Sequence, residues 1–561
     1  MTHYFRSSFT INRIHIVCIA VLLAILHIKA ISGLFSATLA ISNYLFVVSL
    51  SFLSISLLRK LNDKLAVLAT ILWILFLLTE LIINQLTGLH LNSFVFASLL
   101  QQATNSSMAF VSYLITAIAI VTLVYFLQFY NLPRRKQNKI SIKYGHVIGA
   151  LFASLTCTQA IYAIGYYFGE LETVYIKRKL SILVTPHPYY IKKGLSILFE
   201  PSTDNPFARS RSISERQISD GTLSEATLDQ RTNILIIIAD SLRGQDIMKT
   251  PSLAPNIATW SYNLKFRSFN HYSTSNCTHF SIYSLLSGQL PTNFSSARKA
   301  PVVVQPIQTL ISEGYQISTS EAETLDWYDT ASTVYAGQAN RHIVPSKQPN
   351  KDEMAIVDSL NKIQQYQAKK QPFFHVTYLS DTHFPYTSST NKQNKSIYEQ
   401  YLSAIKEVDN NIGFYLGELK STGALDDTLV IITSDHGEEL LENGIIGHSS
   451  RLSPEQVKVP LVIISPVLQD NTQWPKSHID IMPYALSSLS LSAKTIDDNN
   501  SIILANCDYD YPNGFAVITD QSRTDFIFED GFLYNAQTPY SRSTTINREQ
   551  ATKTLLETLS D

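Results

Sequence analysis

Long apolar stretches dominate the first third of the chain. Five of them come close to, or exceed, the length of about 20 residues that a helix needs to cross a lipid bilayer. They run from Ile14 to Phe35, Leu39 to Leu58, Leu65 to Ile83, Met108 to Phe129 and Val147 to Phe168. The pattern predicts a membrane domain of five helices over residues 1–169, followed by a polar part. Length alone leaves open the alternative that one stretch is a buried helix of a soluble domain.

Basic residues in the short connections predict how these helices are oriented. They precede the first stretch and lie between the second and third and between the fourth and fifth, at Arg6, Arg13, Arg59, Lys60, Lys64 and five positions from Arg134 to Lys143. The other two connections carry no basic residue beyond Lys29. Because positively charged loops stay in the cytoplasm, we expect a cytoplasmic N-terminus. An odd number of spans then places the rest of the chain on the other side.

Residues 170–232 form a connector of different character. Tyr189-Tyr-Ile-Lys-Lys193 places aromatic residues beside lysines soon after the fifth stretch, which suits a segment at the lipid headgroups. Lys192 and Lys193 would then bind lipid phosphates. A solvated linker with ordinary charges explains the same composition equally well. From Pro201 to Thr232 the chain is rich in Ser, Arg, Asp and Thr, which predicts a flexible linker.

From Asn233 onward the pattern becomes that of an alternating α/β domain, which we place at residues 233–545. The apolar, β-branched run Ile234–Ile238 is typical of a central parallel strand. Further strands are expected at residues 316–319, 373–378, 428–433 and 459–464, and a helix at 397–419. Ligands of open α/β sheets bind at the carboxyl ends of the strands.

Polar residues follow three of these predicted strands. They are Asp240, His383 and the pair Asp435-His436, with His448 a short distance further on. Carboxylate and imidazole are the ligands that Zn²⁺ or Mn²⁺ prefers, with Mg²⁺ and Ca²⁺ as alternatives. Taken singly, a strand-end aspartate is more often a helix cap and a histidine more often a hydrogen-bonded structural residue. Because all of them end strands of one sheet, the group predicts a divalent metal site.

A hydroxyl-rich segment supplies candidate nucleophiles. Residues 272–281 contain five Ser and Thr hydroxyls and a histidine and lead into an apolar helical stretch that ends near Gly288. A hydroxyl at a helix N-terminus gains from the helix dipole, which also attracts an anionic ester. Ordinary capping of the helix by Ser or Thr is the competing interpretation.

These motifs resemble the alkaline phosphatase/sulfatase superfamily over about residues 233–490. Asn233–Arg243 is similar to the superfamily's opening strand and first metal ligand, and Ser434–Gly444 with His448 is similar to bacterial phosphoethanolamine transferases. The resemblance implies a metal bound by Asp240, Asp435 and His436, with Thr278 as the nucleophile that also contacts the metal. It further implies that His383 and His448 bind the substrate phosphate or a second ion.

Cys277 raises the question of a sulfatase, because sulfatases of this superfamily use a modified cysteine. Their motif requires Pro or Ala two residues later and Arg four residues later, whereas His279 and Ser281 stand there. A formylglycine sulfatase is therefore not expected. Cys507 is the other cysteine of the α/β part, and the sequence leaves open whether the two cysteines pair.

The membrane half, Leu89–Asn92 and Pro188–Lys193 resemble, more loosely, the YejM (PbgA) family of inner-membrane proteins. That resemblance implies a bacterial inner-membrane location with a periplasmic α/β domain, and contact of Lys192 and Lys193 with lipid A phosphates. It also implies control of lipopolysaccharide synthesis through a partner protein in the membrane. The catalytic centre of that family looks degenerate, whereas the metal-ligand set is present here.

Two hypotheses follow. The first is a metal-dependent hydrolase or phosphotransferase acting on a lipid-linked phosphoester, or sulfate ester, of the cell envelope. The second is a catalytically weak or inactive sensor of lipid A or lipopolysaccharide that regulates envelope lipid synthesis through a partner protein. A transporter is not favoured, because the apolar stretches lack paired charges or broken-helix patterns. The balance of 44 basic and 45 acidic residues argues against binding of nucleic acid.

Overall fold

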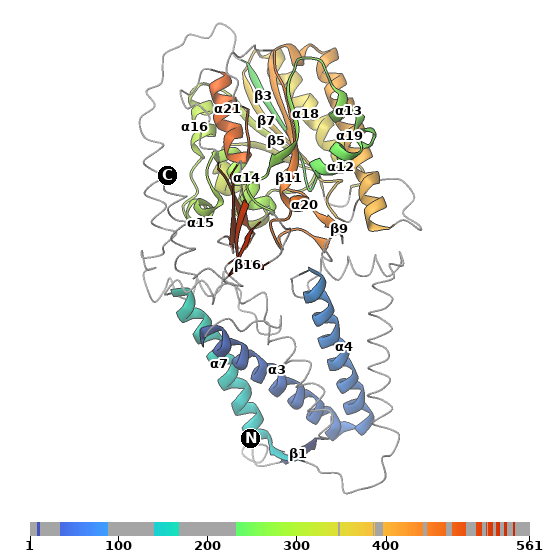
Figure 1. Ribbon diagram of the computed structural model, residues 1–561, viewed down its shortest axis with the longest axis vertical. Coiled ribbons are helices and arrows are strands. Elements are labelled where there is room, and N and C mark those ends of the chain that lie inside the picture. Colours follow the sequence, from blue (N-terminus) through green and yellow to red (C-terminus); the bar gives the residue numbers. More distant parts are fainter. Residues whose placement is uncertain are drawn as a thin grey trace. The chain divides into compact units, whose positions relative to one another are not determined.

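The computed structural model describes part of the 561-residue chain. The described residues are 8–11, 34–87, 140–167, 232–345, 348–384, 386, 396–440, 442, 446–466, 474–489, 501–507, 512, 514–519, 523–527, 532–535 and 542–544. They belong to two compact units, one holding the N-terminal helices and the other the α/β domain (Figure 1).

The described residues of the N-terminal unit include the long helices α3 (Leu34–Leu61), α4 (Asp63–Thr87) and α7 (Tyr144–Tyr167). A short antiparallel pair joins β1 (Ser8–Ile11) to β2 (Ile140–Lys143). Apolar side chains of α3 and α4, such as Val47 and Leu77, pack together, and the Ser42 hydroxyl donates to the Ser154 carbonyl of α7 at 2.7 Å. Small hydroxyl residues therefore lie where α3 meets α7.

Helices occur where the second, third and fifth membrane spans are predicted. Among the described helices, one segment, Ala37–Leu61, is long and apolar enough to cross a membrane, and α4 contains the shorter apolar segment Leu68–Glu80. The first and fourth predicted spans, and the connector with Lys192 and Lys193, lie outside the described residues. The five-helix organisation and the boundaries at residues 169 and 232 therefore stay predictions.

The second unit is built on a seven-stranded sheet with the order β4-β11-β8-β3-β7-β5-β6. Its strands are β3 (Asn233–Ala239), β4 (Leu264–Tyr272), β5 (Gln316–Glu321), β6 (Asn340–Ile343), β7 (Phe373–Leu379), β8 (Thr428–Thr433) and β11 (Lys458–Ile464). β3 pairs in parallel with both β7 and β8, and all seven of its residues are buried. The expected central strand is confirmed, because an apolar run can be buried on both faces only inside the sheet.

Helices cover both faces of this sheet. Figure 1 shows α14, α16 and α21 on one side and α13, α18 and α19 on the other. The helices are α12 (Gly244–Lys249), α13 (Pro255–Thr259), α14 (Thr278–Ser287), α15 (Phe294–Lys299), α16 (Gln305–Ser312), α17 (Thr330–Tyr335), α18 (Lys351–Ala368), α19 (Ile397–Ser421), α20 (Pro454–Val457) and α21 (Ile481–Ser488). The main core lies between the sheet and α14, where Phe280, Leu285 and Ile236 are fully buried. The predicted helix at 397–419 corresponds to α19, which begins with a capping box formed by Ser396 and Glu399.

A smaller antiparallel sheet lies later in the sequence, and neighbouring strands in it are also consecutive along the chain. Its strands are β12 (Ile502–Asn506), β13 (Gly514–Ile518), β14 (Arg523–Ile527), β15 (Phe532–Asn535) and β16 (Arg542–Thr544). A two-residue ribbon, β9 (Glu439–Leu440) with β10 (Ile446–Gly447), lies after β8. β12 attaches to the loop before α14, since Ala505 N donates to Thr274 O at 2.8 Å. The small sheet therefore supports the segment that leads to Thr278.

Candidate active site

Asp240 directly follows β3 and is a buried residue, 5% exposed. The next residue, Ser241, has a φ of +63°, so the chain turns sharply at the end of the strand. The Ser241 amide donates to Asp435 Oδ1 at 3.1 Å, and its hydroxyl donates to Asp240 Oδ1 at 2.9 Å. A non-glycine residue with positive φ is strained, and such strain is common where a loop serves a site. Here the turn brings two carboxylates from neighbouring strands together.

Asp435 and His436 come from the loop after β8, the parallel neighbour of β3, and both are fully buried. The chain continues through Gly437, whose amide donates to Gln456 O at 2.9 Å. A Cβ at Gly437 would lie 2.1 Å from the Glu455 carbonyl oxygen, so a side chain does not fit there. Close packing of the Gly437 backbone against Glu455 therefore fixes the path of the loop that carries Asp435 and His436.

Three donor atoms converge at this edge of the sheet. One ligand atom each of Asp240, Asp435 and His436 lies within 4.8 Å of the other two. His436 Nε2 is 3.5 Å from Asp435 Oδ2 and 4.0 Å from Asp240 Oδ1. His436 Nδ1 lies 3.0 Å from the Gly437 carbonyl, which fits a protonated Nδ1 and an Nε2 lone pair turned toward the carboxylates. Two oxygen donors and one nitrogen donor suit a divalent cation.

The electrostatics of the two carboxylates also fit a cation. Burial, and next the negative charge of Asp240, raise the pKa of Asp435 to about 8. Burial opposes ionisation of Asp240 as well, but His383, His436 and the Tyr378 hydroxyl outweigh it and hold the pKa of Asp240 below its ordinary value. Two adjacent buried carboxylates therefore resist carrying two negative charges unless a positive ion lies beside them.

Tyr378, near the end of β7, supports this pair. Its hydroxyl donates to Asp240 Oδ2 at 2.6 Å and lies 3.4 Å from Asp435 Oδ2. Burial, and then the charges of Asp240 and Asp435, raise the pKa of Tyr378 well above its ordinary value, so the hydroxyl keeps its proton and donates. Sequence reasoning missed this residue, because a tyrosine inside an apolar strand has the pattern of an ordinary core aromatic residue.

Thr278 is the first residue of α14, and its Oγ1 lies 3.2 Å from His436 Nε2. The helix cap is the preceding residue, Cys277, in extended conformation and with no capping bond from its side chain. The competing interpretation of Thr278 as a helix cap is therefore wrong. Its hydroxyl lies against the metal-ligand group, at the helix end whose dipole favours anions.

His383 and His448 complete the cluster. The ring centroid of His448 lies 4.2 Å from that of His436 and 5.4 Å from that of His383. Burial opposes protonation of His383, but Asp240 and then Glu438 outweigh it and raise the pKa of His383. Burial, and next repulsion from His436, lower the pKa of His448. The structure thus brings together the six residues predicted for the catalytic and metal site: Asp240, Thr278, His383, Asp435, His436 and His448.

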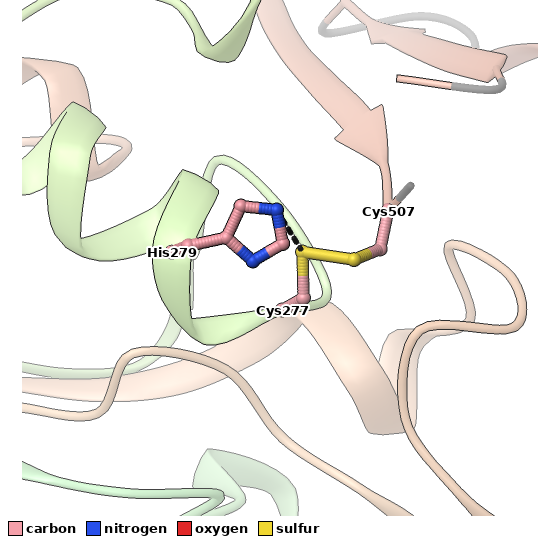
Figure 2. Close-up of side chains that lie close together, drawn as sticks. All are labelled: Cys277, His279 and Cys507. Carbon is pink, nitrogen blue, oxygen red and sulfur yellow. Dashed lines mark hydrogen bonds between the residues drawn. A yellow bond between two sulfur atoms is a disulfide. The ribbon is translucent and has the colours of Figure 1, made fainter. Parts of the chain in front are cut away.

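A disulfide joins Cys277 to Cys507, with 5.7 Å between their Cα atoms (Figure 2). Figure 2 shows the His279 ring beside this bond, and its Nε2 lies 4.0 Å from Cys277 Sγ. The bond ties the residue before Thr278 to the end of β12. It settles the pairing that the sequence left open, and a cysteine in a disulfide cannot be converted to formylglycine. The predicted lipid-binding residues Lys192 and Lys193 lie outside the described residues.

The class of protein follows from this fold and from comparison with known families. Residues 232–490 match the Sulfatase family, so this part of the chain is a sulfatase-family domain of the alkaline phosphatase superfamily. The expected superfamily is confirmed.

Individual relatives share limited sequence identity with parts of this chain. The inner membrane protein YejM of Salmonella typhi is 25% identical over 233 residues, which are 41% of this chain and 37% of that protein. The multifunctional alkaline phosphatase superfamily protein PehA of Trinickia caryophylli is 32% identical over 107 residues, which are 18% of this chain and 21% of that protein. The sulfotransferase Agl7 of low-salt glycan biosynthesis in Haloferax volcanii is 28% identical over 143 residues, 22% of this chain and 35% of that protein. The matches thus span well under half the length of each relative.

Solved structures give similarities at lower identity. The lipoteichoic acid synthase LtaP from Listeria monocytogenes has a TM-score of 0.47 and 16% identity, over 62% of this chain and 97% of that chain. The periplasmic domain of phosphoethanolamine transferase EptC from Campylobacter jejuni has a TM-score of 0.37 and 16% identity, over 48% of this chain and 96% of that chain.

Proposed function

We propose that this protein is a metal-dependent phosphoester hydrolase or phosphotransferase of the cell envelope, which forms a covalent intermediate on Thr278. The observation that carries the proposal is the position of the Thr278 hydroxyl, 3.2 Å from His436 Nε2 within the group of Asp240, Asp435 and His436. A nucleophile, a metal-ligand set and a helix N-terminus thus meet at one point. Zn²⁺ or Mn²⁺ would be held by the two carboxylates, His436 and Thr278.

The Thr278 hydroxyl loses its proton to His448 or to solvent, its oxygen attacks the phosphorus of the ester, and the bond from phosphorus to the leaving oxygen breaks. A divalent cation, when bound, lowers the pKa of the attacking hydroxyl and offsets the charge that develops on the phosphoryl oxygens. Tyr378 fixes Asp240 by hydrogen bonding, which holds the ligand set in shape. The amide end of α14 faces the same anion.

The histidines move protons at the leaving oxygen and at the attacking hydroxyl. His383, whose pKa Asp240 and Glu438 raise against the opposing effect of burial, is suited to pass a proton to the leaving oxygen. His448, whose pKa burial and His436 lower, is a neutral imidazole whose free nitrogen can accept the proton of an attacking hydroxyl. Water, or a hydroxyl of a second lipid, then takes the phosphoryl group from Thr278. An unmodified threonine nucleophile favours phosphate over sulfate esters, since sulfatases of this superfamily use a modified cysteine.

The envelope location rests on two observations. The segment Ala37–Leu61 is long and apolar enough to anchor the chain in a bilayer. The disulfide between Cys277 and Cys507 suits an oxidising compartment such as the periplasm. We therefore propose an inner-membrane protein with a cytoplasmic N-terminus, a periplasmic α/β domain and a lipid-linked substrate. An alkaline phosphatase reporter fused after Asp561 should be active. An inactive reporter would indicate a cytoplasmic C-terminus and would contradict this topology.

The test of the activity uses the full-length protein in detergent with added Zn²⁺ or Mn²⁺. It is assayed on a phosphomonoester, a phosphodiester, a phosphonate ester, a sulfate ester and a phosphoethanolamine lipid. Replacing one metal ligand, as in Asp435→Ala, should reduce turnover on the order of a thousandfold, because several kcal/mol of transition-state stabilisation is lost. Mass spectrometry of the quenched reaction should find phosphate on the Thr278 peptide. Wild-type turnover by the Asp435→Ala variant on every active substrate contradicts the proposal.

A sensor of lipid A that acts through a partner protein is the second candidate, motivated by the similarity to YejM over 233 residues. In that case the binding energy comes from Lys192 and Lys193 rather than from the metal site. A paired phenotype separates the two functions. A sensor fails when both lysines are replaced by alanine and tolerates Thr278→Ala, whereas an enzyme shows the opposite result.

A further inference from the structure

Glu438 is a buried acid beside the site to which the mechanism above assigns no direct part in the chemistry. It comes two residues after His436, and its side chain is 1% exposed. Its Oε1 lies 3.4 Å from His448 Nδ1, and its Oε2 accepts a hydrogen bond from the Tyr386 hydroxyl at 2.6 Å. One carboxylate therefore contacts side chains from two different loops.

Both loops carry a histidine of the site. Tyr386 belongs to the loop after β7 that contains His383, and its amide donates to His383 O at 3.1 Å. Tyr386 is 1% exposed, has a φ of +30° and packs edge-on against Tyr401 with ring centroids 5.4 Å apart. A non-glycine residue in such a conformation persists only where its surroundings hold it. The hydrogen bond to Glu438 is one of the contacts that do so.

Burying a carboxylate here is costly, since Asp240 and Asp435 are buried in the same site. A neutral residue of similar size would fill the space without that cost. The contacts with Tyr386 and His448 offset part of this cost, and of the two partners His448 belongs to the site. When a carboxylate contacts one nitrogen of an imidazole, it fixes which nitrogen carries the proton and how the ring is turned.

We propose that Glu438 is a positioning residue that keeps His448 protonated on Nδ1 and so leaves the lone pair of its Nε2 free to accept the proton of the attacking hydroxyl. Through Tyr386 the same carboxylate links the His448 loop to the loop of His383, which sets the spacing of the two imidazoles. The inference rests on the proposed function, in which His383 and His448 move protons at the leaving oxygen and at the attacking hydroxyl.

A double-mutant cycle tests the coupling. Glu438→Ala should lower kcat about 10- to 100-fold, the range found when the outer partner of a histidine in a metal site is removed. His448→Ala should cost at least as much, and the double variant should be no slower than His448→Ala alone, because Glu438 acts through His448. Additive losses, or wild-type kcat in a folded Glu438→Ala variant, overturn the proposal.

A second measurement does not depend on turnover. In ¹⁵N NMR of the full-length, histidine-labelled protein in lipid, the His448 signals are assigned by their loss in His448→Asn. They should show a proton on Nδ1 in the wild type and a mixture of tautomers in Glu438→Ala. Glu321→Gln is the matched control, because Glu321 is equally buried but pairs with Arg341 at 2.7 Å, and it should leave the His448 signals unchanged.

An unchanged His448 tautomer in Glu438→Ala overturns the inference even if the enzyme is active. Conversely, a wild-type protein that turns over none of the esters contradicts the proposed function, while the NMR result still decides the role of Glu438. The two failures are therefore distinguishable.

Discussion

The Thr278 hydroxyl oxygen lies 3.2 Å from Nε2 of His436, although 158 positions separate the two residues in the sequence. The contact joins the first turn of α14 to the loop after β8. It exists because β4, which leads toward α14, and β8 both pair with β11 in the same sheet. The helix end and the metal-ligand group are thereby held at one edge of that sheet.

Thr278 offers the most direct test of the nucleophile. Thr278→Ala removes the attacking oxygen and should reduce kcat on the order of a thousandfold or more, whereas Thr278→Ser keeps a hydroxyl and should retain much of the activity. The helix cap is the backbone of Cys277, so the thermal unfolding temperature of both variants should stay near that of the wild type. Equal losses in the Ser and Ala variants would contradict the role of the hydroxyl.

Metal binding should be visible in stability. Zn²⁺ or Mn²⁺ at 100 times its dissociation constant should stabilise the folded protein by about 2.7 kcal/mol, since it binds the native site. In Asp435→Asn that gain should largely vanish. The metal-free variant should be at least as stable as the metal-free wild type, because the buried Asp435 carboxyl must take up a proton on folding and an amide need not. Thermal unfolding with chelator and with added ion measures both effects, and an equal ion-induced gain in both proteins would refute the site.

The pH dependence of the chelated protein follows from Asp435. Its pKa is raised by burial and by Asp240 to about 8, so between its ordinary pKa near 3.8 and about 8 the folded state binds more protons than the unfolded state. Stability from this group is therefore present at low pH and is lost as the pH rises toward 8. The difference in unfolding temperature between wild type and Asp435→Asn should grow over that interval. Metal affinity should rise over the same interval, because binding releases the proton.

The disulfide should matter for both stability and turnover. Replacing Cys277 and Cys507 together by serine should cost about 2–4 kcal/mol of stability, since the bond closes a long loop in the unfolded chain. It should also lower kcat at temperatures where the variant is fully folded, because the residue before Thr278 loses its tie to β12. Cys157→Ser is the control, since Cys157 is a free cysteine. Unchanged kcat in the folded double variant would show that the bond is only structural.

Gly437 should tolerate no side chain. In Gly437→Ala the new Cβ would lie 2.1 Å from the Glu455 carbonyl oxygen, so the loop carrying Asp435 and His436 must shift. We expect a loss of more than about 2 kcal/mol in stability together with weaker metal binding. Gly417→Ala, in α19 with open space around it, is the matched control and should be neutral or stabilising by up to about 1 kcal/mol. Similar unfolding temperatures for the two variants would contradict this account.

The strands of the α/β domain, and the polar residues that follow them, are evident in the amino-acid pattern. Ile234–Ile238 and Leu429–Thr433 are apolar runs that only the interior of a sheet can bury, and parallel strands end at the same edge. The pattern is therefore sufficient to predict that Asp240, Asp435 and His436 lie together. The conformation of each element and the order of the elements along the chain depend on neighbouring residues. The periodicity of apolar positions in the sequence therefore reveals both.

Which side chains touch, in contrast, depends on how the elements pack. Packing paired Cys277 with Cys507 across 230 positions, turned Thr278 toward His436 rather than into a cap, and set Tyr378 and Glu438 against the site. Tyr378 and Tyr386 have the pattern of core aromatic residues, and only the folded chain brings their hydroxyls to Asp240 and Glu438. Such contacts join segments far apart in the chain, so their energies depend on the packed fold and leave no periodic trace in the sequence.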